Sequence, residues 1–536
     1  MAGTASLDKT LSRGRKAAKA GDWVTAFEAY QSVLDRFAGN KKAIKGMQEL
    51  KPAVPDLLQQ AQAAQKAADW TQAERLLNAA FGLAPETPQI GIALAATQLE
   101  ISRAPGARTT ALKVLKHAPG NPEALNFKGR AERTMGLSDA AEASFKAALG
   151  HPETDAQTLN NLGILARAQG ALDQARAYYE QALALAPDNV IIHRNLAQLT
   201  SYTADHPHLM AMRALAEQAP AHDTAKAPLH FALFHALDKI GAYDEAFAHL
   251  ETANALARKA APYDFQKDAI PTALGKALIK GPIEGVKDTP ADRTPIFVTG
   301  LPRSGTTLVE RILSRAQGTQ ACGELSVVQT AVSQLLRDVM ARDDKPLKPA
   351  DIGQLRDALR QGLAEYSDGS PVMIDKMPLN FEWIGFICAA LPEAKVIHIA
   401  RDPMAVAWSL YRMSFEGAGN GFVYAPGDIA RYMVLHRDIM AHWRSCFPDR
   451  ICDISYEDLI AEPENTTKAI AGATELAWSA DWLSPEKAKS QVLTASAEQV
   501  RQPIYQDSNA QWKRYEAALA PLRQALVSTG ILADDS

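Results

Sequence analysis

A glycine-rich turn in the second half of the chain carries the clearest potential for chemistry. The apolar run 295–299 leads into Gly300, and Gly305 follows five residues later at the start of an amphipathic stretch. A strand that enters a helix through such a turn presents backbone N–H groups and a helix N-terminus to an anion. Thr306 stands where loops that bind nucleoside triphosphates carry lysine. With Arg303 inside the turn, the pattern favours an anion other than a Mg²⁺-bound triphosphate.

The elements that must position this turn are short apolar runs, each followed by a helical pattern. This alternation predicts βα units, and therefore a parallel sheet that is covered on both faces. Ligands of such sheets bind beyond the C-terminal ends of the strands. Lys376, Arg401 and Tyr456 directly follow three of the runs and are expected at that edge. The four predicted strands are 295–299, 372–374, 396–400 and 451–455.

The run Pro302-Arg303-Ser304-Gly305-Thr306-Thr307 resembles the 5′-phosphosulfate loop of sulfotransferases that use 3′-phosphoadenosine 5′-phosphosulfate (PAPS). The resemblance is to the tyrosylprotein sulfotransferase family and its bacterial relatives, and it extends over roughly residues 295–515. It implies a P-loop-like α/β domain that moves sulfonate from PAPS to an acceptor hydroxyl and releases adenosine 3′,5′-bisphosphate. No metal is implied.

The same resemblance implies roles for individual residues. Glu324 corresponds to the general base, while Lys376 and Arg303 correspond to the groups that stabilise charge on the bridging oxygen of the donor. Arg401 and Ser409 correspond to ligands of the 3′-phosphate. The remaining donor contacts that it implies are Arg303, Ser304, Gly305, Thr306 and Thr307 at the 5′-phosphate, with Tyr456, Ser496 and Arg501 toward the adenosine and 3′-phosphate end.

The chain departs from the family pattern at two cationic positions. The family has an arginine four residues beyond the serine, whereas this chain has Met413 there and Arg412 one residue earlier. The family's lysine before a tryptophan is Gln511 here, which leaves Lys513 as a possible substitute. His398, flanked by isoleucines within a predicted strand, is interpreted as a core residue.

Residues 1 to about 260 contain an internal repeat. Ala68, Ser102, Gly136 and Gly170 follow one another at 34-residue intervals, which is the period of tetratricopeptide repeats. These positions are predicted to be turns between helices. Pro85, Pro119 and Pro187 recur 34 and 68 residues apart and mark the end of the second helix of a repeat. Copies outside this register begin at Gly21 and Gly241.

The predicted organisation is an α-helical tetratricopeptide solenoid at 1–262, a joint at 263–294 and the α/β domain at 295–536. Solenoids of this kind bind peptides or proteins on their concave face, although a spacer or a dimerisation element is the open alternative. Together with the resemblance to tyrosylprotein sulfotransferases, this makes a protein or peptide tyrosine the first candidate acceptor. A carbohydrate, lipid or small-molecule hydroxyl is the alternative, and a repeat scaffold with an inactive or nucleotide-sensing domain is the competing class.

Composition limits the binding partners and the cellular compartment that the sequence predicts. A net charge of −4 gives no general attraction to nucleic acid or to an anionic membrane. The sequence has no apolar run of about 18 residues and no apolar leader, so membrane insertion is not expected and a cytoplasmic protein is predicted. The four cysteines lack Cys-x-x-Cys spacing, which argues against a disulfide framework or a structural metal.

Overall fold

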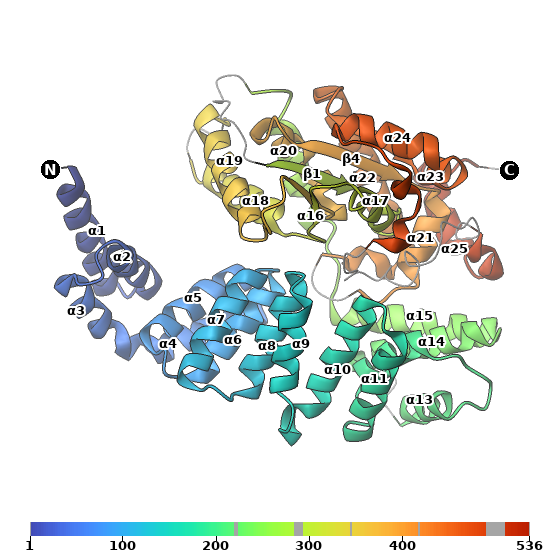
Figure 1. Ribbon diagram of the computed structural model, residues 1–536, viewed down its shortest axis with the longest axis horizontal. Helices are drawn as coiled ribbons and strands as arrows, with labels where there is room; N and C mark the ends of the chain where they lie inside the picture. The colour runs from blue at the N-terminus through green and yellow to red at the C-terminus, as the bar shows by residue number, and fades with distance from the viewer. Residues whose placement is uncertain are drawn as a thin grey trace. The chain divides into compact units, whose positions relative to one another are not determined.

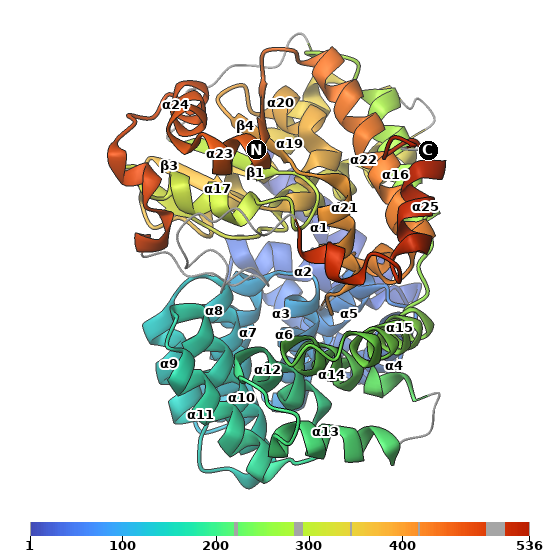
Figure 2. The same ribbon diagram turned by 90° about the vertical axis from the view of Figure 1, so that its right-hand side faces the viewer.

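The computed structural model describes residues 2–218, 223–283, 293–342, 346–415, 419–488 and 510–534. The chain divides into two compact units, Met1–Leu162 and Gly163–Ser536. Figures 1 and 2 show the helices and strands of both units from two directions. Among the described residues, no helix combines the length and the apolar character needed to cross a bilayer.

The first unit consists of antiparallel helices in sequence-adjacent pairs. Its core contains aromatic side chains that pack against small residues of the neighbouring helix, as Phe81 does against Gly91. The helices are α1 Ala2–Lys19, α2 Trp23–Arg36, α3 Lys41–Leu50, α4 Val54–Lys66, α5 Trp70–Leu83, α6 Pro88–Glu100, α7 Ala104–His117, α8 Pro122–Thr134 and α9 Ser138–Ala147. Helix α10, Pro152–Gln169, contains the boundary with the second unit.

The turns inside the repeats share one backbone motif. The left-handed φ angles that define it are 56° at Ala68, 56° at Ser102, 76° at Gly136 and 87° at Gly170. Just after each of these residues, an amide donates to the carbonyl five residues earlier, as Asp69 does to Ala64 at 2.9 Å. This is the Schellman motif that ends many helices. The predicted 34-residue register is confirmed, and the out-of-register Gly21 and Gly241 also have positive φ.

The prolines of the repeat end the second helices as expected. Helices α5 and α7, and helix α11 of the second unit, each stop two residues before one of them. The second unit begins with further helices that precede the first strand. They are α11 Leu172–Leu185, α12 Val190–Leu199, α13 Pro207–Glu217, α14 Ala227–Lys239, α15 Tyr243–Ala260 and α16 Gln266–Leu278.

A five-stranded parallel sheet forms the centre of the second unit. Its order is β2-β3-β1-β4-β5, so β1 lies in the middle. The register places Phe297 opposite Asp375 of β3, and Thr299 opposite His398 of β4. The four predicted strands are confirmed, and β2 is an additional strand. The strands are β1 Thr294–Thr299, β2 Thr319–Ala321, β3 Val372–Asp375, β4 Lys395–Ala400 and β5 Ile451–Ser455.

Helices cover both faces of this sheet (Figure 1), as predicted from the βα alternation. Ile296 and Val298 of β1 pack in one cluster with α17, α23 and α24, whereas Phe297 packs in the opposite cluster with α18, α20 and α22. The helices that follow the first strand are α17 Thr306–Leu313, α18 Val327–Met340, α19 Pro349–Ala364, α20 Ile384–Ala390, α21 Pro403–Tyr411, α22 Pro426–Cys446, α23 Tyr456–Ala461, α24 Pro463–Thr474 and α25 Ala520–Ser528.

Helices α14 and α15 lie side by side (Figure 2) and share a hydrophobic core with the α/β domain. The ring of Phe234 meets Trp408 of α21 edge-on, with 6.1 Å between centroids. Asn254 of α15 donates its side-chain amide to the carbonyl of Tyr411 at 3.0 Å. Tyr515 donates its hydroxyl to Asp238 at 2.7 Å. The last helical pair is therefore packed as part of the domain that contains the sheet.

Candidate active site

The five parallel strands end at one edge of the sheet, and each is followed by a polar group singled out in the sequence. The glycine-rich turn 300–305 follows β1, and Glu324 follows β2 after two residues. Lys376, Arg401 and Tyr456 come immediately after β3, β4 and β5. Because parallel strands place their C-terminal ends at the same edge, the topology gathers these groups there.

The turn after β1 requires glycine at both ends. Gly300 has φ +153° and Gly305 has φ +110°, in the region that side chains rarely adopt. A Cβ atom on Gly300 would lie 2.4 Å from the carbonyl oxygen of Ile399, and one on Gly305 would lie 2.6 Å from the Tyr456 ring. Arg303, between them, adopts φ +72°, a left-handed conformation that is uncommon outside glycine. The turn is therefore fixed in shape by its neighbours.

The side chains that follow the turn suit an anion. Ser304, Thr306 and Thr307 are buried, with Thr306 and Thr307 in the first turn of α17 and Gly305 as its N-cap. Ser304 is 1% exposed, and its hydroxyl has no hydrogen-bond partner among the described residues. A buried hydroxyl without a partner is costly, and a phosphate oxygen would satisfy it. The helix N-terminus adds amide donors and a favourable dipole.

Two arginines and a serine connect this turn to β4 and α21. The Nε of Arg303 donates to the Ser409 hydroxyl at 2.9 Å, across 106 residues of sequence. Arg401 donates its Nη1 to the carbonyl of Arg303 at 3.1 Å. The Arg401 guanidinium also lies over the ring of Tyr456, 4.4 Å from its centroid. The structure thus brings together four of the residues predicted to bind the donor.

Lys376 and Glu324 form an ion pair at the other side of the turn. The Lys376 ammonium lies 2.5 Å from a carboxylate oxygen of Glu324. The Lys376 side chain is fully buried, whereas 42% of the Glu324 side chain is exposed. The arrangement leaves a carboxylate accessible to an incoming molecule while a buried cation fixes its position.

Two buried carboxylates that sequence reasoning missed lie beside this ion pair. Glu310 of α17 accepts from the amide of Gly323, and Asp375 of β3 accepts from the amide of Leu325. Burial raises the pKa of both carboxyls, to about 7 for Asp375, and the charge of Lys376 opposes the rise. Glu310 and Lys376 therefore belong to one electrostatic group. For Glu310, the sequence signal of a buried carboxylate was an acidic residue among the apolar residues of α17.

Other predicted residues lie in different surroundings. Ser496 and Arg501 fall outside the described residues. Arg412, one residue before Met413, donates to the side-chain oxygen of Gln511 at 3.0 Å, so it contacts the residue that replaces the family's lysine. His398 is 2% exposed and both of its ring nitrogens have partners, Asp453 at 2.7 Å and His436 at 3.0 Å. This is the satisfied core imidazole that the sequence predicted.

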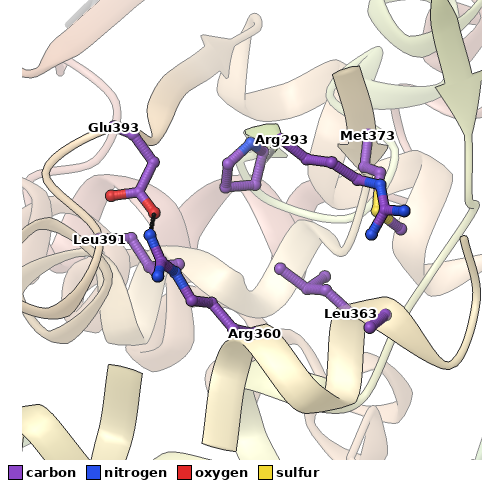
Figure 3. Close-up of a pocket in the computed structure, with 8 residues that line it drawn as sticks. Arg293, Arg360, Leu363, Met373, Leu391 and Glu393 are labelled. Atoms are coloured by element: carbon purple, nitrogen blue, oxygen red, sulfur yellow. Dashed lines mark hydrogen bonds and ion pairs between the residues drawn. The ribbon is translucent and has the colours of Figure 1, made fainter. Parts of the chain in front are cut away.

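A separate pocket lies on the sheet near the start of β1 (Figure 3), where Arg293 and Met373 line it. Its carboxylate, Glu393, is paired with Arg360 at 3.1 Å and with Arg356 at 3.0 Å. None of the predicted site residues that the structure describes lines this pocket. It is therefore distinct from the group of side chains at the C-terminal edge.

Both the repeat part and the α/β part of the chain contain segments that match known protein families. Residues 295–480 match the model of the sulfotransferase family, and residues 92–158 and 156–189 match models of the tetratricopeptide repeat. An uncharacterised protein of Aquifex aeolicus is 35% identical over 245 residues, 44% of this chain and 32% of that protein. The protein-tyrosine sulfotransferase of Drosophila melanogaster is 23% identical over 243 residues, 40% of this chain and 46% of that protein.

Among solved structures, the sulfotransferase domain of the Synechococcus PCC 7002 olefin synthase aligns with a TM-score of 0.32 at 17% identity. That alignment covers 48% of this chain and 100% of the domain. The chain spans 32% and 46% of the length of the two curated relatives. In its family-model matches, the chain is similar to the sulfotransferase family at residues 295–480 and to tetratricopeptide repeats in the preceding segments.

Proposed function

We propose that this protein transfers the sulfonate group of PAPS to the hydroxyl of an acceptor, with adenosine 3′,5′-bisphosphate as the second product. The observation that carries the proposal is the Glu324–Lys376 pair, which follows β2 and β3 at the edge where the anion-binding turn follows β1. A base, a buried cation and an anion site are the three parts that such a transfer requires.

The donor would bind along the C-terminal edge of the sheet. Its 5′-phosphosulfate would lie against the turn, where the buried Ser304 hydroxyl and the N-terminus of α17 supply donors. Its 3′-phosphate would be bound by Arg401 and Ser409, because a guanidinium matches a phosphate with two parallel hydrogen bonds. Tyr456, beneath Arg401, would lie toward the adenosine. We also propose Ser496 and Arg501 for that end of the donor.

The transfer would proceed by attack of the acceptor oxygen on sulfur, in line with the leaving bisphosphate. Glu324 would take the proton of the acceptor hydroxyl as the new O–S bond forms. Negative charge grows on the bridging oxygen as the old S–O bond breaks, and Lys376 and Arg303 would stabilise it. Lys376 suits this role because it is fully buried, where a cation acts through a lower dielectric than in water.

The acceptor that we propose first is a tyrosine of a peptide or protein. The similarity to the Drosophila enzyme supports it, and the repeats provide a surface of the class that binds peptides. A carbohydrate, lipid or small-molecule hydroxyl is the alternative acceptor. We also retain the division into repeats at 1–262, a joint at 263–294 and a catalytic domain at 295–536, and a cytoplasmic location.

The test is calorimetric titration of adenosine 3′,5′-bisphosphate, without divalent metal, into the full chain and into Arg401→Ala. Binding that weakens strongly in the variant supports the donor, and ³⁵S-labelled PAPS then tests a tyrosine peptide, a sugar and a simple phenol as acceptors. Absence of binding to the unaltered chain would refute the proposal. Binding of Mg-ATP instead would indicate a kinase or nucleotidase, and binding of neither would favour a repeat scaffold.

A further inference from the structure

We propose that Glu310 and Asp375 are positioning residues that fix the backbone on both sides of Glu324. This inference rests on the proposed role of Glu324 as the base. The family resemblance assigns no role to either carboxylate, and neither is exposed enough to serve as a surface charge, with 6% and 1% exposure. Each reaches the loop after β2 from a different element, α17 for Glu310 and β3 for Asp375.

The contacts bracket Glu324. The amide of Gly323, one residue before it, donates to Glu310 Oε1 at 2.9 Å. The amide of Leu325, one residue after it, donates to Asp375 Oδ1 at 3.3 Å. The carbonyl of Gly323 accepts from the backbone amide of Lys376 at 2.8 Å. Three backbone groups around the base are therefore fixed by α17 and by the end of β3.

This loop needs such support because its own structure is weak. The strand before it, β2, has three residues, and it pairs with β3 alone at the edge of the sheet. Gly323 has φ +68°, and a Cβ built there would meet no atom within 4 Å, so no side-chain packing constrains the turn. Without the two carboxylates, the position of Glu324 would depend on the Lys376–Gly323 backbone bond and on the ion pair of its partly exposed side chain.

Burying the carboxylates of Glu310 and Asp375 costs electrostatic free energy, which favours a role for them other than stabilising the fold. Desolvation of Glu310 and Asp375 raises the pKa of both carboxyls, which means that burial disfavours their ionised forms. The Lys376 ammonium, bound to Glu324 at 2.5 Å, is close enough to both to offset part of that cost. The cation that would stabilise the leaving group therefore also favours the ionised forms of the carboxylates that fix the base.

The experiment compares Glu310→Ala, which removes the acceptor, with Glu310→Gln, which keeps an oxygen for the Gly323 amide. Asp375→Ala and Asp375→Asn make the same comparison on the other side. Glu382→Gln is the matched control, because Glu382 is also a carboxylate with a pKa raised by burial but bonds to Tyr432 instead. Transfer from ³⁵S-labelled PAPS to a tyrosine-containing peptide gives kcat and the KM for PAPS, and hydrogen exchange reports the amides of Gly323 and Leu325.

We expect Glu310→Ala to lower kcat by roughly 10- to 100-fold, the usual effect of misplacing a reacting group by about 1 Å. The KM for PAPS should stay within about twofold, because the proposed donor contacts are untouched. The Gly323 amide should exchange faster. Glu310→Gln should recover most of kcat, and Glu382→Gln should match the unaltered chain.

Three outcomes would overturn the inference. An unaltered kcat in Glu310→Ala and in Asp375→Ala would show that the base does not depend on them, while the enzyme itself remains active. A higher KM for PAPS at constant kcat would assign Glu310 to the donor site. No transfer by the unaltered chain, to the peptide or to a simple phenol, would remove the proposed function and this inference together. If Glu310→Ala does not fold, Glu310→Met, which keeps the side-chain volume but no strong acceptor, and Asp375→Ala decide by the same measurements.

Discussion

Arg401 is the side chain whose loss should weaken donor binding most. Its Nη1 donates to the carbonyl of Arg303, and its guanidinium plane lies over the ring of Tyr456 at 4.4 Å. These contacts orient the guanidinium before any ligand arrives, so little rotamer entropy is lost on binding. A hydrogen bond to a charged group contributes about 1.5–3 kcal/mol. Loss of the two hydrogen bonds from Arg401 to the 3′-phosphate should cost about 3–6 kcal/mol, which corresponds to a Kd higher by roughly 100-fold or more.

Calorimetry with adenosine 3′,5′-bisphosphate measures this effect directly. The affinity of Arg401→Lys should lie between those of the unaltered chain and Arg401→Ala. It should be about tenfold weaker than that of the unaltered chain, because the charge remains but the planar guanidinium and its stacking are lost. Arg360→Ala is the matched control, since Arg360 pairs with Glu393 and lines the pocket near the start of β1. If Arg401→Ala binds the bisphosphate as the unaltered chain does, with an unchanged Tm, the reasoning about the 3′-phosphate is wrong.

Other consequences can be tested separately. Glu324→Gln should lower kcat by about 10²–10⁴-fold with bisphosphate affinity retained, as measured by ³⁵S transfer and calorimetry. Gly305→Ala should lower the free energy of unfolding by about 1–3 kcal/mol in urea titrations, because its Cβ would meet the Tyr456 ring at a φ of +110°. Ala68→Gly should raise the stability of the first unit by about 1 kcal/mol, since alanine is strained at φ +56°. Burial raises the pKa of Glu382 to about 8, so the folded chain binds this proton more tightly than the unfolded chain. The stabilisation that this bound proton gives the folded chain is therefore lost as pH rises from about 4 to 8. In urea titrations, the free energy of unfolding of Glu382→Gln should depend less on pH over that window.

The repeat turns and most of the sheet could be predicted because each rests on a local pattern. The 34-residue spacing from Ala68 to Gly170 identifies the turns even where alanine or serine replaces glycine. Four strands are apolar runs that precede helices, and their C-terminal ends place Lys376 and Arg401 at one edge. Strand β2, by contrast, is Thr-Gln-Ala, which has neither the length nor the apolar character to indicate a strand.

The contacts within the site could not be predicted, because they join distant parts of the chain. The bond between Arg303 and Ser409 crosses 106 residues, and it depends on the left-handed backbone at Arg303. Glu310 follows a run of apolar residues in α17, and its sequence position alone does not distinguish a buried carboxylate from a charge on the rim of the helix. Only the packing of α17 against the loop after β2 reveals its role.

The shared core of α14, α15 and the α/β domain determines how this protein can be dissected. A recombinant fragment that started at residue 295 would remove the partners of Trp408 and Tyr515, which are Phe234 and Asp238 of α14. It would also expose the apolar surface that α14 covers, and exposed surface of this kind promotes aggregation. Fragments meant to keep the sheet domain folded should therefore begin before residue 227. A fragment that begins at residue 295, where the family match starts, should be insoluble.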